Sequence, residues 1–99
     1  MHTIYKYPLV NTMVQVILLP EDAGILNIEY QYGALQLWAG INTDNPLVEH
    51  VIHMYGTGLE IPELPISREL VYINTVFLDQ KSFVFHFFEE VDVEETTHH

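Results

Sequence analysis

Apolar and polar residues alternate along almost the whole chain, and this period of two restricts the fold more than any other feature. The segment 25–32, ILNIEYQY, is the clearest case, because it places Leu26 and Ile28 on one face and Asn27 between them on the other. Successive side chains of a strand point to opposite faces, so the pattern predicts half-buried β-strands. No window of helical length carries the 3.6-residue stripe of an amphipathic helix.

Turn residues separate the alternating segments. Gly33 lies in a tight hairpin turn between two of them, and DQKS at 79–82 is a second hairpin turn. The segment 57–69 contains Pro62 and Pro65, so it is expected to be a loop or an edge, because proline cannot donate to a sheet ladder. The pattern favours an all-β fold of about seven short, mainly antiparallel strands in a small sandwich or barrel. The expected strands cover 2–7 (ended by Pro8), 12–19, 25–32, 35–41, 47–55, 70–78 and 83–89.

A chain of 99 residues is expected to form one domain, here a β domain over 1–90 followed by a flexible acidic tail over 91–99. Hydrophobic residues make up 48% of the chain and charged residues only 17%, below the roughly 25% typical of soluble domains. A small chain with so few charges exposes apolar surface, so we expect a homo-oligomer that hides an apolar patch. His98 and His99 are either native or an expression remnant, and neither is a candidate site residue.

Fourteen acidic residues against three Lys and Arg give a net charge of −11. This field repels a nucleic acid backbone and suits a basic protein partner, although acidity that only keeps the chain in solution is an equal alternative. The absence of cysteine excludes disulfides, thiol catalysis and thiolate metal sites, and it fits a cytosolic protein. No apolar run approaches the roughly 18 residues of a membrane span, and the N-terminus lacks a signal-peptide core, so no membrane partner is expected.

The histidines and serines offer little catalytic or metal chemistry. His50 and His53 are three residues apart, which on a strand places them on opposite faces, so they are expected to be ordinary half-exposed histidines and not metal ligands. His86 lies among phenylalanines and is expected to be a core residue bonded to backbone, with a pH-sensing role as the alternative. Ser67 and Ser82 lie in predicted turns. We therefore expect no catalytic residue, no metal, no cofactor and no enzyme activity.

Gly56-Thr57-Gly58 is the best candidate for a ligand loop, because glycines let successive amides form an anion nest. A nearby aromatic wall would stack a base, and an arginine would neutralise an anion. Against this, the triplet lacks the lysine and the following helix of a P-loop, and a plain turn at a strand end is the favoured alternative. The candidate ligand-binding residues are Gly56, Thr57, Gly58, Trp38, Tyr55 and Arg68.

Several short motifs follow one another in a familiar order: K-Y-P at 6–8, W-A at 38–39, G-T-G at 56–58 and aromatic-H-x-F-E at 85–89. In this order the chain resembles, over about residues 4–89, a family of small uncharacterised phage and prophage proteins, a domain of unknown function. The resemblance implies a phage-type origin and an intracellular host setting, and it brings no activity. The chain departs from the family at Asn74, where glycine is usual. The resemblance falls on Lys6, Pro8, Pro20, Trp38, Gly56, Thr57, Gly58, Thr75, His86 and Phe88.

These observations favour a non-enzymatic binding protein, phage-encoded and located in the host cytoplasm. It would act as a counter-defence factor that blocks a basic, nucleic-acid-binding host defence protein through an acidic surface carrying Glu60, Glu63 and Glu69. The first alternative is an oligomeric sponge for a nucleotide-type signal, using Gly56-Thr57-Gly58 and the aromatic residues. The second alternative is a small virion or assembly component.

Overall fold

The computed structural model describes residues 1–78 and 83–93, which form seven β-strands and contain no helix. The prediction of an all-β fold is therefore confirmed. The predicted hairpin turn at 79–82 and the end of the predicted tail, 94–99, lie outside the described residues. The strands are β1 (His2–Leu9), β2 (Val14–Pro20), β3 (Gly24–Gln31), β4 (Ala34–Asn42), β5 (Leu47–Gly56), β6 (Arg68–Leu78) and β7 (Phe83–Asp92).

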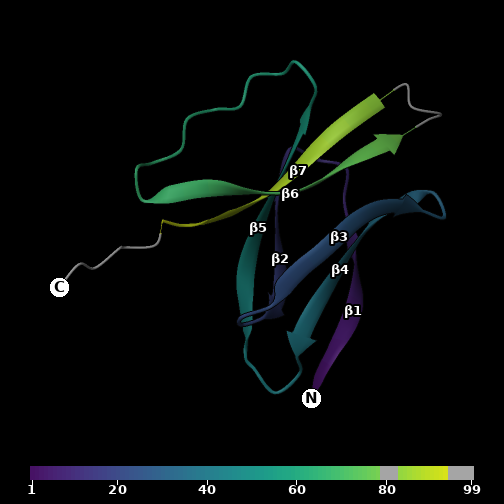
Figure 1. The fold of residues 1–99 in the computed structure, drawn as a ribbon, viewed down its shortest axis with the longest axis vertical. Coiled ribbons are helices and arrows are strands. Elements are labelled where there is room, and N and C mark those ends of the chain that lie inside the picture. The colour runs from purple at the N-terminus through teal and green to yellow at the C-terminus, as the bar shows by residue number, and fades with distance from the viewer. Residues whose placement is uncertain (79–82, 94–99) are drawn as a thin grey trace.

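The strands form two antiparallel sheets that pack as a small sandwich (Figure 1). The three-stranded sheet has the order β1-β4-β3, and the four-stranded sheet has the order β2-β5-β7-β6. The first two strands therefore lie in different sheets, as do β4 and β5. The aromatic strand β7 lies inside its sheet, between β5 and β6, where both of its edges are paired. A strand so prone to aggregation is thereby kept from other chains.

The core lies between the inner faces of the two sheets. Ile28 and Leu37 come from the three-stranded sheet, and Leu19, Ile52 and Phe87 come from the four-stranded sheet, and all five are almost completely buried. Alternation is clearest in β4, where every second residue from Leu35 to Ile41 is buried, as a period-two pattern requires. Leu9 of β1 and Val76 of β6 complete the core, so all seven strands contribute buried side chains to the space between the sheets.

The alternation in β3 is interrupted by a bulge. The register against β4 shifts between Ile25 and Asn27, so Ile25 packs against the core and Leu26 is 55% exposed. The prediction that Leu26 shares a face with Ile28 is therefore wrong, because a bulge inserts one residue and reverses the facing of everything before it.

Several strand ends differ from the predicted limits by one to three residues, and those of β1 and β7 have a consequence for the fold. β1 does not stop at Pro8 but continues to Leu9, with Pro8 opposite Gln36. Proline is tolerated there because β1 is an edge strand with β4 as its partner in the described sheet, so one side of its backbone needs no ladder partner. β7 continues to Asp92 and so includes the first residues of the segment expected to be a tail.

The hairpin between β3 and β4 has a two-residue loop, Tyr32-Gly33, and Gln31 pairs with Ala34 on either side of it. Both loop residues have positive φ, 52° and 79°, which is the type I′ geometry whose twist matches antiparallel strands. Positive φ is unfavourable for Tyr32, because its β-carbon clashes with the backbone there. Its side chain is 93% exposed, so packing does not compensate for this strain.

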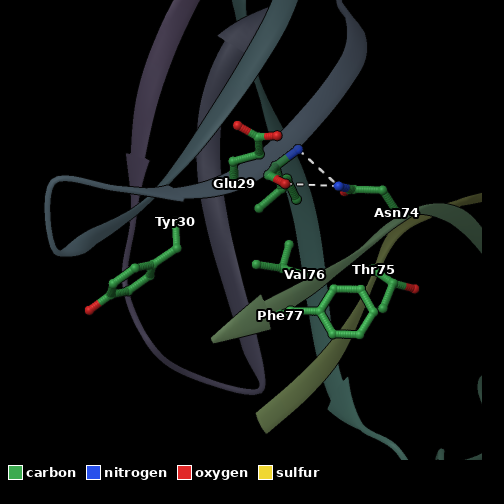
Figure 2. A pocket seen from close by; sticks show the side chains of 7 residues that line it. Glu29, Tyr30, Asn74, Thr75, Val76 and Phe77 are labelled. Carbon is green, nitrogen blue, oxygen red and sulfur yellow. Dashed lines mark hydrogen bonds between the residues drawn. The ribbon is translucent and has the colours of Figure 1, made fainter. Parts of the chain in front are cut away.

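The Asn74 side chain links the two sheets by hydrogen bonds between β6 and β3. β6 has a bulge between Tyr72 and Asn74, and the Asn74 side chain reaches the free edge of β3 (Figure 2). Its amide nitrogen donates to the Ile28 carbonyl at 2.8 Å and to Oδ1 of Asn27 at 2.8 Å, and its oxygen accepts from the Ile28 amide at 3.2 Å. The side-chain amide therefore bonds to Ile28 as the backbone of a neighbouring strand would. Position 74, where the family usually has glycine, does not have a positive φ.

We call these three hydrogen bonds of Asn74 the clamp. A groove of about 350 Å³ lies beside the clamp, between β3 and β6 (Figure 2). Its lining residues are Ile28, Glu29, Tyr30, Asn74, Thr75, Val76 and Phe77.

Candidate functional site

The outer face of the four-stranded sheet, the face turned away from the other sheet, carries two rows of polar and aromatic side chains. In the first row, His53 of β5 lies opposite Phe88 of β7, which lies opposite Tyr72 of β6. In the second row, Tyr55, His86 and Thr75 are aligned in the same way. The Phe88 ring lies 6.3 Å from Tyr55 and 5.7 Å from Tyr72, within the range of favourable aromatic pairs.

A charged network occupies one end of this face. Glu90 accepts hydrogen bonds from Nε2 of His53 at 2.7 Å and from Nε of Arg68 at 2.8 Å. A second nitrogen of Arg68 binds Asp92, and the Tyr55 hydroxyl lies 2.7 Å from Nδ1 of His53. Since a carboxylate only accepts, His53 donates from Nε2 to Glu90, and Nδ1 of the neutral ring then accepts a hydrogen bond from the Tyr55 hydroxyl.

Hydrogen bonds to Glu90 and then to Asp92 raise the pKa of Arg68, and two further pKa values in the network are shifted. Hydrogen bonds from Arg68 and then from His53 hold the pKa of the Glu90 carboxyl below its ordinary value. Burial, and then the nearby Glu90 charge, raises the pKa of the Tyr55 phenol above its ordinary value. These two shifts favour an ionised Glu90 and a protonated Tyr55, which are the protonation states that the hydrogen bonds require. His53 is only 3% exposed, so its imidazole is enclosed within the network and is not open to solvent.

A chain of hydroxyls and one imidazole occupies the other end of the face. Oγ1 of Thr57 lies 2.7 Å from Nε2 of His86, and Nδ1 of His86 lies 2.9 Å from Oγ1 of Thr75. Thr75 in turn lies 2.7 Å from the Tyr72 hydroxyl. The expectation that His86 is a core residue bonded to backbone is wrong, because it is half-buried on the outer face and bonded to side-chain hydroxyls. This series of hydrogen bonds connects Thr57 to both β7 and β6.

His50 and His53 do lie on opposite faces, as predicted, and each binds its own carboxylate. His50 lies on the inner side, with Nδ1 2.8 Å from Glu89, and its Nε2 is buried without a hydrogen-bond partner among the described residues. The expectation that both are half-exposed is wrong for His53, because Tyr55 and Glu90 satisfy both of its nitrogens and permit burial. No group of three or more metal-ligand side chains occurs within residues 1–78 and 83–93.

Gly56-Thr57-Gly58 forms a turn at the end of β5. The Leu59 amide donates to the Gly56 carbonyl at 3.2 Å, and Gly58 has φ of 87° at the third turn position, where positive φ favours glycine. The Thr57 amide donates to the Val84 carbonyl at 3.3 Å. Two of the amides that an anion nest would use are therefore committed to carbonyls, and this conformation offers no phosphate cradle.

The other residues predicted to bind a ligand are not brought together with this turn. Trp38 lies on β4, in the opposite sheet. Tyr55 is buried, and Arg68 is already paired with two carboxylates. A groove of about 330 Å³ adjoins Gly56 and Thr57, but none of these three residues lines it, so a small-molecule role for the set stays a prediction.

The residues predicted to contact a partner lie on or beside the loop 57–67. Glu60 and Glu63 are exposed on this loop, and Glu69 is exposed at the start of β6. In Figure 1 the loop runs outside both sheets, from the end of β5 to the start of β6. It also presents Leu59, Ile61 and Ile66 to solvent, with Ile66 98% exposed.

Sequence reasoning missed the two networks of the outer face. Alternation in each strand does indicate which histidines and glutamates share a face. It does not indicate which of them are neighbours, because the hydrogen-bond partners lie on different strands. Only the register of β5, β6 and β7 shows which residues meet.

One family model, described as a domain of unknown function (DUF7352), matches residues 1–98. No curated protein and no solved structure matches the chain. Among the described residues there is no helix long and apolar enough to cross a membrane.

Proposed function

Because the chain belongs to the DUF7352 family, whose description assigns no activity, we propose its function from geometry: a non-enzymatic protein that binds another protein through the loop 57–67. The observation that carries this proposal is the exposure of apolar and acidic side chains together on one loop. A chain of this size gains nothing in its own fold from three exposed large aliphatic residues on an 11-residue loop, whereas a partner surface would bury them.

The loop is prepared for binding before a partner arrives. At its start, Thr57 is bonded to His86 and to the Val84 carbonyl, and at its end the Arg68 amide donates to the Pro65 carbonyl at 2.9 Å. Pro62 and Pro65 restrict the backbone between these anchors. A loop with fixed ends and restricted dihedrals loses less conformational entropy when it docks, so more of the contact energy appears as affinity.

The composition of the loop supports a partner that is both basic and apolar at the contact. Glu60 and Glu63 make no ion pair within the described residues, so their charges are available to a basic surface. Leu59, Ile61 and Ile66 require apolar area beside those cations. The resemblance to phage and prophage proteins supports a narrower proposal: the partner is a basic, nucleic-acid-binding host defence protein, which this chain blocks in the host cytoplasm.

The test is a charge reversal on the loop with a matched reversal elsewhere. The full chain is used to capture partners from a bacterial lysate, and the affinity of the purified partner is then measured at several salt concentrations. The Glu60→Lys/Glu63→Lys variant should bind at least tenfold more weakly and with a flatter salt dependence. The Glu21→Lys/Glu29→Lys control makes the same change in net charge at exposed positions away from the loop.

An equal loss of affinity in the control would show that only net charge matters, which contradicts a loop-specific contact. Unchanged affinity in the loop variant would refute the proposal outright.

A further inference from the structure

The edge strand β2 differs from the other three edge strands. Edge strands expose unpaired backbone groups, and proteins protect them with charges, prolines or bulges. β1 carries Lys6 and Pro8 within the strand, and β3 and β6 each contain a bulge. β2 pairs with β5 in an unbroken register, has no charged residue, and its proline, Pro20, is its last residue. The sandwich thus has an unprotected edge.

The residues of β2 that face this edge can be identified from two hydrogen bonds to the β5 side. The Met13 carbonyl accepts from the Met54 amide, and the Glu21 amide donates to the Pro46 carbonyl, both at 2.8 Å. In an antiparallel ladder, alternate residues turn both of their backbone groups toward the same neighbour. Odd-numbered residues of β2 therefore bond to β5. The amides and carbonyls of Val14, Val16 and Leu18 point away from β5, to the free edge.

The same three residues carry the exposed apolar side chains of the strand. Val14, Val16 and Leu18 are 47%, 54% and 56% exposed on the outer face. Their side chains and their backbone groups thus form one surface that lacks both hydrophobic cover and hydrogen-bond partners within the described residues.

The distribution of charge indicates what kind of molecule could bind at the β2 edge. The chain has a net charge of −11, so two copies repel each other wherever acidic side chains meet. Between Lys6 and Glu21 there is no Asp, Glu, Lys or Arg, so the β2 edge is a place where a second copy can approach without bringing like charges into contact. An acidic partner gains nothing there, and neither does a basic one, because the edge presents no charge to complement.

We propose that two copies of this chain associate by antiparallel pairing of β2 with β2 about a two-fold axis at Val16. Val16 then lies opposite Val16 of the second copy, and Val14 lies opposite Leu18. Each of these pairs exchanges both backbone hydrogen bonds, since all three residues present their amides and carbonyls to the edge. The two four-stranded sheets become one continuous sheet.

The pairing is self-complementary in the way a two-fold interface requires, because the same three residues serve both sides. On the outer face, β-branched and leucine side chains meet as cross-strand pairs, which stabilise antiparallel sheets. The loop 57–67 takes no part, so dimerisation is independent of the function proposed above.

The oligomeric state tests the proposal directly. Sedimentation and light scattering of the intact chain at micromolar concentration should give a mass twice 11.5 kDa. Val16→Lys should be a monomer, because it places like charges at the two-fold axis. Val16→Pro should also be a monomer, because it removes an edge amide. Ile4→Lys, the same change at a comparably exposed position of edge strand β1, should remain a dimer. Far-UV circular dichroism and thermal unfolding would establish that each variant is folded.

A single cysteine gives a second readout that needs no disruptive change. The chain has no cysteine, so Val16→Cys under mild oxidation can link only to another copy at the same position. Paired Cα atoms about 5.5 Å apart allow a disulfide, so it should form at least tenfold faster than in Ile4→Cys. A monomeric wild type, a dimer that survives both Val16→Lys and Val16→Pro, or equal cross-linking at positions 16 and 4 would each overturn the proposal.

Discussion

Replacing Asn74 with alanine removes the clamp between the two sheets and leaves the rest of β6 unchanged. The substitution deletes three hydrogen bonds: two donated by the Asn74 amide nitrogen and one accepted by its oxygen. Two of them satisfy the backbone of Ile28, which is completely buried. Alanine at position 74 therefore leaves that amide and carbonyl with only the neighbouring groove from which water can approach.

The magnitude follows from the number of bonds. A hydrogen bond contributes about 1 kcal/mol net, so three give a loss of about 3 kcal/mol. This is a large part of the roughly 5–15 kcal/mol that stabilises a small domain. For a domain of this size, each kcal/mol lowers Tm by about 4–8 °C, so Asn74→Ala should lower Tm by about 12–24 °C.

Urea denaturation and thermal unfolding followed by circular dichroism would measure the loss. Asn45→Ala is the matched control, because Asn45 makes one side-chain hydrogen bond, to the Glu21 carbonyl in an exposed turn, and should cost about 1 kcal/mol or less. Asn74→Asp should be worse than alanine, because its carboxylate would face two oxygens, those of Asn27 and Ile28. If Asn74→Ala costs no more than Asn45→Ala, the reasoning that this amide holds the sheets together is refuted.

Four further substitutions test other parts of the fold. Tyr32→Asn should raise the free energy of unfolding by about 0.5–1 kcal/mol in urea denaturation, since asparagine accepts positive φ more readily; a loss of stability would contradict the turn assignment. Phe87→Ala should cost about 3–5 kcal/mol and the exposed Phe77→Ala less than about 1 kcal/mol, and similar values would argue against the core described here. Glu90 has a lowered pKa in the fold, so its contribution is present above its ordinary value of 4.5 and is lost as pH falls through the lower folded value. Glu90→Gln should therefore flatten the fall in stability below pH 4.5, and a slope equal to that of the wild type would exclude Glu90 as its source.

The sequence alone determined the class of fold, because alternation is a property of each strand by itself. Period two indicated strands along the chain, and it predicted a tight hairpin around Gly33, although it assigned Tyr32 to the strand and the structure places Tyr32 in the turn. The prolines of 57–69 marked that segment as non-regular, and the structure places a loop at 57–67. These features depend on local geometry, in which each residue interacts with its chain neighbours.

The tertiary structure decided which face of each strand is buried and which side chains meet. Alternation shows that Val14, Val16 and Leu18 share a face, but only the sandwich shows that this face is exposed while Leu19 is in the core. The bulge in β3 was similarly invisible, because it is a property of pairing with β4.

The candidate site depended most on tertiary structure. His53 is a buried residue because Glu90 lies on the adjacent strand, and Thr57 is held because His86 lies beside it. Each partner is about 30 residues or more away along the chain, at a position set by strand order and register. Strand order and register are properties of the whole sheet, so a single strand carries no record of the side chains it will meet.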